Sequence, residues 1–393
     1  MKKSLLAVVL AGTIGGLFFT APSFSADPAP YKIGLCVALT GPAVSIGEPN
    51  KNGALTLMEE INAAGGINGR KLEAVIDDEQ AAPDKAVIGT KRLIDVENVV
   101  AVQGYEYSGA ALAAMVSAEA GLTPMVVGCV TEKTWVPTKK WVYSVVPRQK
   151  DAFSTILDTF IKLGVKKIAC IYVDAAMGQN AREALEWAAK QKGLEITIVE
   201  KYSLGTSDVS PQVMHVKSSG ADALFIAGYT ADAAMVVKTA KSLGFKGPIA
   251  GDQAVIGPEF IKLVGADGEG FLTTAPKAIV AHDLKDDDIQ KKIAVALHDT
   301  YTQKYGTFVL GSAHGWDSMN LVTSALRKVD PKLDPSKPSD VEQIREQIRD
   351  NLEKLGEVIG QNGTYRITPE NHNGLPPNSH IMLTLKDGTW KQY

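Results

Sequence analysis

The stretch that decides the fold runs from Ile33 to Gly69 and reads IGLCVALTGPAVSIGEPNKNGALTLMEEINAAGGING. It opens with an apolar run of strand length at 33–39, passes through a turn-rich loop at 40–49 and enters a helical pattern that ends at a Gly-Gly pair. Open α/β sheets bind ligands at loops that join the carboxyl end of a strand to a helix. The segment therefore predicts one wall of a binding crevice.

The same alternation of strand and helix patterns continues along the chain in two series. It predicts an α/β protein with two doubly wound, parallel-sheet lobes. The first series has expected strands at 33–39, 72–76, 99–103 and 124–127, with helices at 54–64, 84–95 and 110–120. The second has expected strands at 167–172, 195–202, 223–227 and 249–251, with helices at 152–163, 180–191, 212–218 and 232–243. The remainder predicts helices at 286–305, 313–328 and 340–355 and short strands at 363–366 and 381–385.

The first 26 residues have the pattern of a secretory signal peptide. Lys2 and Lys3 precede an apolar stretch that runs to Phe19, and Ser23, Ser25 and Ala26 supply small residues for cleavage. The stretch is shorter than the roughly 20 apolar residues of a membrane span. The first cysteine is Cys36, so no lipid-anchoring cysteine follows the signal. We expect a free periplasmic protein.

Composition excludes several classes of protein. Charged residues make up 22% of the chain and the net charge is −3, so no basic field exists for nucleic acid or an anionic membrane. The three cysteines, Cys36, Cys129 and Cys170, lie in apolar patterns and are expected to be buried free thiols.

The sequence has no P-loop and no dinucleotide-binding motif after an expected strand. The Ser of 311–315 is one place early for a nucleophile elbow, and the six histidines lack the H-x-x-x-H spacing of a zinc site. We expect no enzyme activity, no metal and no cofactor.

Several motifs of the deciding stretch resemble one family. The T-G-P of 40–42, Gly47, the N-G of 52–53 and the run E-x-I-N-A-A-G-G-I-N-G-R over 59–70 are similar to the opening of the leucine/isoleucine/valine-type periplasmic binding proteins, the substrate-capturing subunits of ABC importers. The resemblance implies a monomer whose chain crosses between lobes near 145–149, 273–277 and 355–362. It gives a first lobe of 27–146 plus 275–356 and a second lobe of 147–274 plus 357–393. It also implies an inner-membrane permease and ATPase complex as partners, and no disulfide here, since the family's bridge positions lack Cys.

Ser108 is the central candidate for ligand binding. It follows the expected strand at 99–103 and stands just before a helix of small residues, where a hydroxyl and free backbone N–H groups can hold a carboxylate. From the residues alone it could equally be a simple helix N-cap. The resemblance favours carboxylate binding and adds Thr131, at the end of the run Gly128-Cys129-Val130-Thr131.

The resemblance also supplies candidates in the second lobe. Met177 and Tyr229 correspond to positions that cover the ligand, and Asp252 or Gln253 to the position where amino-acid binders present an acid to the ligand ammonium. The predicted binding set is Ser108, Cys129, Val130, Thr131, Met177, Tyr229, Asp252, Gln253, Tyr107 and Ile46.

Two ligand classes follow from these positions. The stretches 314–317 and 368–375 (TPENHNGL) resemble the branch of the family associated with aromatic acids, and the flexible thioether of Met177 accommodates aromatic rings, which together favour a small hydrophobic or aromatic carboxylate. If Gln253 contacts the ligand, a ligand without an ammonium is favoured too, such as a 2-oxo acid or an aromatic carboxylate. If Asp252 contacts it, a branched-chain amino acid is favoured instead, because a buried ammonium needs a charged partner. A sensing subunit for a receptor is the alternative to a transport role, and fold alone does not separate the two.

Overall fold

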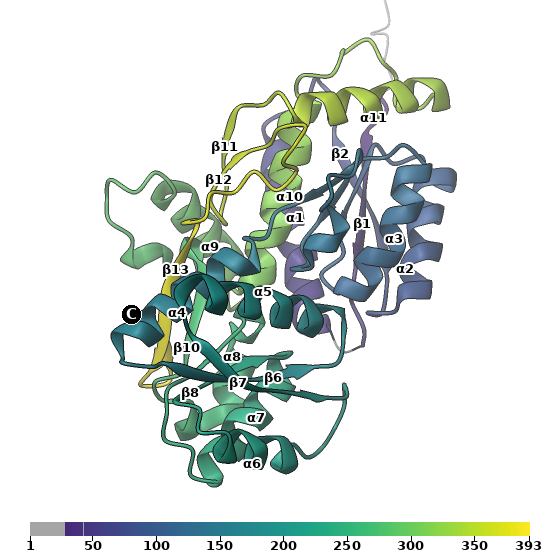
Figure 1. The fold of residues 1–393 in the computed structure, drawn as a ribbon. Coiled ribbons are helices and arrows are strands. Elements are labelled where there is room, and N and C mark those ends of the chain that lie inside the picture. Colours follow the sequence, from purple (N-terminus) through teal and green to yellow (C-terminus); the bar gives the residue numbers. More distant parts are fainter. Residues whose placement is uncertain (1–27, 42) are drawn as a thin grey trace, which may run out of the picture.

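The computed structural model describes residues 28–41 and 43–393, which form two α/β lobes (Figure 1). The predicted signal peptide lies outside the described residues. The first sheet has the order β2-β1-β3-β4-β5 and is parallel throughout. Its strands are β1 (Tyr31–Val37), β2 (Leu72–Asp78), β3 (Ala101–Gly104), β4 (Met125–Val127) and β5 (Val142–Ser144).

Helices cover both faces of this sheet because its strands are apolar on both sides. One core cluster packs against α1 (Val44–Ala63), α10 (Leu310–Leu326) and α11 (Pro338–Leu352). The other packs against α2 (Pro83–Lys91) and α3 (Ser108–Ala120).

The second sheet has seven strands in the order β14-β13-β10-β9-β8-β6-β7. The two C-terminal strands pair antiparallel, and the others are parallel. The strands are β6 (Lys167–Val173), β7 (Glu195–Tyr202), β8 (Ala223–Ala227), β9 (Ile249–Gly251), β10 (Leu272–Pro276), β13 (His380–Lys386) and β14 (Thr389–Gln392). Every residue of β8 is buried, as the continuous apolar run predicts.

The helices of the second lobe also lie on both faces of its sheet. They are α4 (Gln149–Lys162) and α5 (Ala176–Lys192) on one face and α6 (Ser210–Ser218), α7 (Thr230–Ser242) and α8 (Pro258–Val264) on the other. Helix α9 (Lys291–Tyr305) packs in a separate cluster that joins residues of β10 and β13 to Ala313 of α10. The prediction of a two-lobed, doubly wound α/β fold is confirmed.

The C-terminal region departs from the expected division of lobes. The hairpin β11 (Glu357–Ile359) and β12 (Thr364–Arg366) was assigned to the second lobe, but Tyr365, Ile367 and Leu375 pack in the core of the first sheet. Only β13 and β14 join the second sheet, so the last crossing follows Leu375 rather than lying at 355–362. The stretch 368–375 contacts β5 and the first crossing, where the Asn373 side chain donates to the carbonyls of Ser144 and Val146.

The first helix also differs from expectation. It begins at Val44 rather than near residue 54, so most of the expected loop is helical and Pro49 lies inside the helix. Gly47 permits this early start, because a Cβ there would overlap the backbone of Ala38 at the end of β1. The sequence pattern had suggested a loop because Gly and Pro usually break helices.

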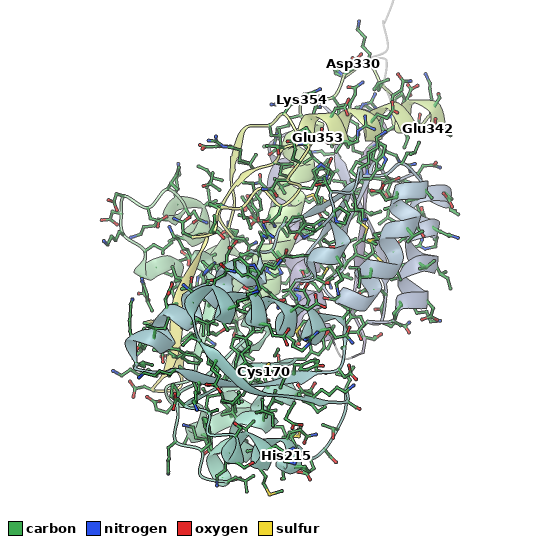
Figure 2. All side chains as sticks on the ribbon, viewed as in Figure 1. Cys170, His215, Asp330, Glu342, Glu353 and Lys354 are labelled. Atoms are coloured by element: carbon green, nitrogen blue, oxygen red, sulfur yellow. The ribbon has the colours of Figure 1, made fainter. Side chains whose placement is uncertain are left out.

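The three cysteines are free and buried, as predicted. Figure 2 shows Cys170 within the sheet of the second lobe. Among the described residues, no helix is both long and apolar enough to cross a membrane.

Candidate functional site

A small cavity lies between the lobes, at the carboxyl ends of strands from both sheets. Its volume is about 30 Å³, enough for roughly two water molecules. The first lobe contributes Ile46, Glu106, Gly128, Val130, Leu310 and His314 to its lining, and the second contributes Met177, Tyr229, Asp252, Gln253 and Ala254. No lysine or arginine lines it.

Six predicted site residues lie together in this lining, namely Ile46, Val130, Met177, Tyr229, Asp252 and Gln253. Asp252 and Gln253 both line the cavity, so the choice between them stays open. Tyr107 does not line it but stacks on Tyr229 from the opposite lobe, with ring centroids 6.0 Å apart. The remaining three, Ser108, Cys129 and Thr131, are buried but are not among the lining residues.

Ser108 is not the N-cap residue of α3, which was the alternative to ligand binding. It is the first residue of α3, and Tyr107 occupies the N-cap position without a side-chain capping bond. The N-cap interpretation of Ser108 is therefore wrong. Its role in carboxylate binding stays a prediction.

Sequence reasoning missed a polar cluster on the first-lobe wall. Glu106 accepts hydrogen bonds from the Asn50 side chain through Oε1 and from Nδ1 of His314 through Oε2, the latter at 3.2 Å. All three side chains are buried. Burial raises the pKa of Glu106, and the His314 ring and the Asn50 amide partly offset that rise. The sequence feature that could have indicated this cluster is Glu106 itself, the charged residue in the strand-to-helix loop GYEYSG.

Close packing of α1 against α10 brings this cluster together. Gly311 and Gly315 stand four residues apart on α10, and a Cβ at either position would overlap backbone atoms of α1, the carbonyl oxygens of Ile46 and Asn50 respectively. Gly53 of α1 meets the backbone of Ser312 in the same way. The run Gly311-Ser312-Ala313-His314-Gly315 is thus a helix contact that allows Asn50 and His314 to reach Glu106.

Asp252 is the acid of the second-lobe wall. Its Oδ1 accepts from the backbone N–H of Ala254 at 2.9 Å, and its Oδ2 accepts from Nε2 of Gln149 at 2.6 Å. Burial raises its pKa, and these two donors partly offset that rise. Both donors favour the ionised carboxylate.

Asn180 links this acid to the opposite lobe. Its Nδ2 donates to Oε1 of Gln149 and, at 3.2 Å, to the carbonyl of Val130, while its Oδ1 accepts from the backbone N–H of Glu132 at 3.3 Å. Val130 and Glu132 belong to the first lobe, so these bonds connect the two lobes.

Replacing Asn180 by alanine should therefore weaken ligand binding about tenfold, because two interlobe hydrogen bonds of roughly 1 kcal/mol or less each are lost from the closed state alone. Titration calorimetry measures the change. Gln179→Ala, at the exposed neighbouring position, is the matched control and should leave affinity unchanged. Equal affinity of the Asn180 variant and the control would contradict the role in closure.

A second buried acid lies behind the site. Glu79 follows β2, is fully buried, and neither of its carboxylate oxygens has a hydrogen-bond partner among the described residues. Burial, with a smaller contribution from the charge of Glu106, raises its pKa to about 8. Glu79 is therefore mainly protonated in the folded protein at neutral pH.

This raised pKa predicts that the protein loses stability as pH increases. Stability from Glu79 is fully present below its ordinary pKa of 4.5 and is lost as pH rises through about 8. Chemical denaturation from pH 5 to 9 should show a decline that Glu79→Gln reduces by about 3 kcal/mol, since the amide cannot ionise. Glu73→Gln, at an exposed position of β2, should keep the full decline. An unchanged decline in the Glu79 variant would contradict the assignment.

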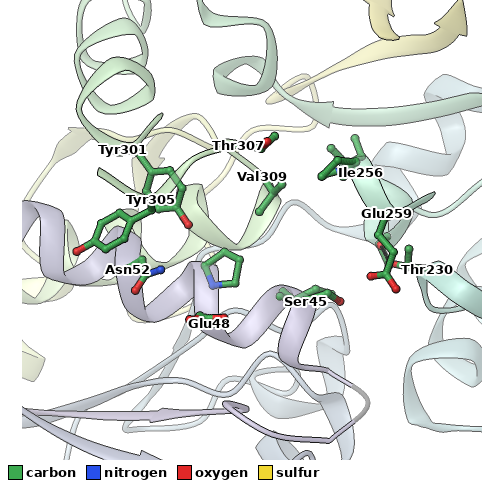
Figure 3. A pocket seen from close by; sticks show the side chains of 15 residues that line it. Ser45, Glu48, Asn52, Thr230, Ile256, Glu259, Tyr301, Tyr305, Thr307 and Val309 are labelled. Carbon is green, nitrogen blue, oxygen red and sulfur yellow. Dashed lines mark hydrogen bonds between the residues drawn. The ribbon is translucent and has the colours of Figure 1, made fainter. Parts of the chain in front are cut away.

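A larger groove of about 400 Å³ adjoins the small cavity (Figure 3). Ser45, Glu48 and Asn52 of α1 face Thr230 and Glu259 of the second lobe across it. Ile46 and Ala254 line both the groove and the cavity, so the two spaces are neighbours.

One group of possible metal ligands lies away from the cavity. His282, His298 and Asp299 bring ligand atoms within 4.8 Å of one another in the part of the chain that the structure describes. His282 and Asp299 are exposed, and both histidines hydrogen-bond to the Asp299 carboxylate. Sequence spacing did not indicate this group, because its members come from different elements.

Comparison with known proteins gives one consistent result. A family model described as "Periplasmic binding protein" matches residues 30–386. The Leu/Ile/Val-binding protein homolog 7 of Brucella melitensis is 32% identical over 295 residues, which span 72% of this chain and 68% of that protein. The leucine-, isoleucine-, valine-, threonine-, and alanine-binding protein of Pseudomonas aeruginosa is 23% identical over 340 residues, 86% of each chain. The crystal structure of an extracellular ligand-binding receptor from Rhodopseudomonas palustris HaA2 superposes with a TM-score of 0.84 at 29% identity, covering 93% of this chain and 99% of that one.

Proposed function

Because this chain belongs to the periplasmic binding protein family, in its Leu/Ile/Val-binding type, we propose that it is the substrate-binding component of an ABC importer and closes its two lobes on a small amino acid. It would act in the periplasm and deliver its ligand to a membrane permease and its ATPase. The relatives are binding proteins rather than enzymes, which supports a role without turnover.

The observation that carries this proposal is the charge of the cavity lining. Two buried acids, Glu106 and Asp252, face a cavity without lysine or arginine. A buried carboxylate needs a cationic or hydrogen-bonding partner, and an α-ammonium group supplies both. Asp252 accepts hydrogen bonds from Gln149 and from the backbone of Ala254, both of which favour its carboxylate form, the form that pairs with an ammonium.

The same lining supports a position for the ligand carboxylate. Gly128 and Val130 are the first-lobe residues of the cavity nearest in sequence to Thr131, and Ser108 begins a helix whose N-terminal dipole favours an anion. A ligand lying between this region and Asp252 touches both lobes. Contacts with both lobes favour the closed form over the open one.

An aromatic carboxylate without an amine is the second candidate. Met177 and Tyr229, which line the cavity, favour it because a thioether and an aromatic ring pack well on a ligand ring. The two buried acids favour the amino acid.

The experiment that tests the function is titration calorimetry of the mature protein, unfolded and refolded to remove bound ligand. The panel holds alanine, valine, isoleucine, leucine, phenylalanine, phenylpyruvate, benzoate and 4-hydroxybenzoate. We expect one-to-one binding of at least one small amino acid and no binding of the acids that lack an amine. Binding confined to those acids would overturn the amino-acid assignment in favour of the second candidate.

A further inference from the structure

We propose that the variable part of the ligand ends in a hydrogen-bond donor, a hydroxyl or a primary amide, which binds to Glu106 and His314. This inference rests on the proposed function and names the substrate class within it.

The evidence begins with atoms that have no partner. Nε2 of His314 and Oδ1 of Asn50 are buried and make no hydrogen bond to any described residue. His314 is 1% exposed, and it lines the cavity together with Glu106. A buried polar atom left without a partner costs about 1–3 kcal/mol, so a ligand that satisfies His314 gains that energy on binding.

The hydrogen bonds within the cluster determine which kind of group fits. Nδ1 of His314 lies 3.2 Å from Oε2 of Glu106, so Nε2 is the ring nitrogen that has no partner among the described residues. Glu106 accepts from the Asn50 amide, and a carboxyl group has further lone pairs for a ligand donor. A hydroxyl or a primary amide both donates and accepts, so it can donate to Glu106 and also pair with Nε2 of His314.

A hydrocarbon terminus would fit this wall poorly. It would remove water from the Glu106 carboxylate and from Nε2 of His314 without replacing the lost hydrogen bonds. Sites built to bind a ligand hydroxyl or N–H reject analogues that lack it, for this reason.

Asn50 maintains the arrangement from behind. Its side-chain amide donates to Oε1 of Glu106, which leaves Oε2 for His314. The glycine contacts between α1 and α10 hold the backbones that carry Asn50 and His314 close to Glu106.

The test is calorimetry on the refolded mature protein with two pairs of amino acids of nearly equal shape, threonine with valine and asparagine with leucine. We expect the donor-bearing member of at least one pair to bind at least tenfold more tightly. A preference below tenfold in both pairs, or a preference for the hydrocarbon members, overturns the inference and leaves the proposed function intact. No binding of any of the four, nor of any amino acid in the broader panel, overturns the function and the inference together.

Variants of Glu106 provide a second test of the inference, with the preference for donor-bearing amino acids as the measured quantity. Glu106→Leu should reduce the donor preference at least tenfold, whereas Glu48→Gln, at an exposed position of α1, should preserve it. Glu106→Gln keeps the side-chain shape and serves if the leucine variant does not fold; it should also reduce the preference, because an amide is a weaker acceptor than a carboxylate. An undiminished preference in the folded Glu106 variants would overturn the assignment of Glu106.

Discussion

Replacing Gly315 by valine should destabilise the protein by more than about 4 kcal/mol, enough to prevent accumulation of folded protein at 37 °C. A Cβ at this position overlaps the carbonyl oxygen of Asn50, which is backbone of α1 and cannot rotate away. The two helices must separate, and the first-lobe core that α10 shares with the sheet loses packing as they do. Thermal and chemical unfolding of purified protein measure the effect.

A graded series gives this prediction its control. Gly315→Ala should already cost about 2 kcal/mol or more, and valine should cost more than alanine. Gly257→Ala is the matched control, since a Cβ there meets only Val309, at an ordinary distance of 3.8 Å, and it should change stability by less than about 0.5 kcal/mol. Wild-type stability in Gly315→Ala would show that α1 and α10 are not in backbone contact.

Replacing Asp252 by asparagine should weaken amino-acid binding by a factor of about 100 to 1000. The ligand ammonium would lose its only second-lobe carboxylate in the cavity lining, and losing one partner of a buried charge pair costs about 3–5 kcal/mol. Asparagine preserves size and can still bond to Gln149, so the fold should be retained. Titration calorimetry measures the loss.

The comparison variant is Asp267→Asn, an exposed aspartate of the same lobe, which should bind like wild type. The Asp252 variant should also distinguish the two ligand candidates. If the ligand lacks an amine, removal of a negative charge should preserve or improve affinity. Unchanged or tighter amino-acid binding in Asp252→Asn would contradict the ammonium assignment.

Much of the fold could be predicted from local pattern. The apolar runs at 223–227 and 249–251 coincide with β8 and β9, because a strand buried on both faces consists of consecutive apolar residues. Short strands with polar residues were less visible. The strand β5, with the sequence Val-Tyr-Ser, was not predicted, because its tyrosine and serine interrupt the apolar run that marked β8 and β9.

The site was only partly predictable for a different reason. Asp252 was a candidate because the resemblance to the periplasmic binding proteins implied a ligand contact at Asp252 or Gln253, and both residues line the cavity. Glu106 and His314 were not found as a pair, because they are 208 residues apart and meet only through the packing of α10.

By itself the sequence determined a two-lobed α/β protein with a site at the strand ends, because hydrophobic periodicity and turn residues act locally along the chain. Only the tertiary structure decided that residues 357–375 pack in the first lobe, that α1 begins at Val44, and that a glutamate, a histidine and an asparagine form one polar wall. These outcomes depend on how closely two backbones approach. For α1 and α10 that distance is set by glycines on the two facing helices. The hydrophobic pattern of either helix alone does not show which helix it will face or how closely.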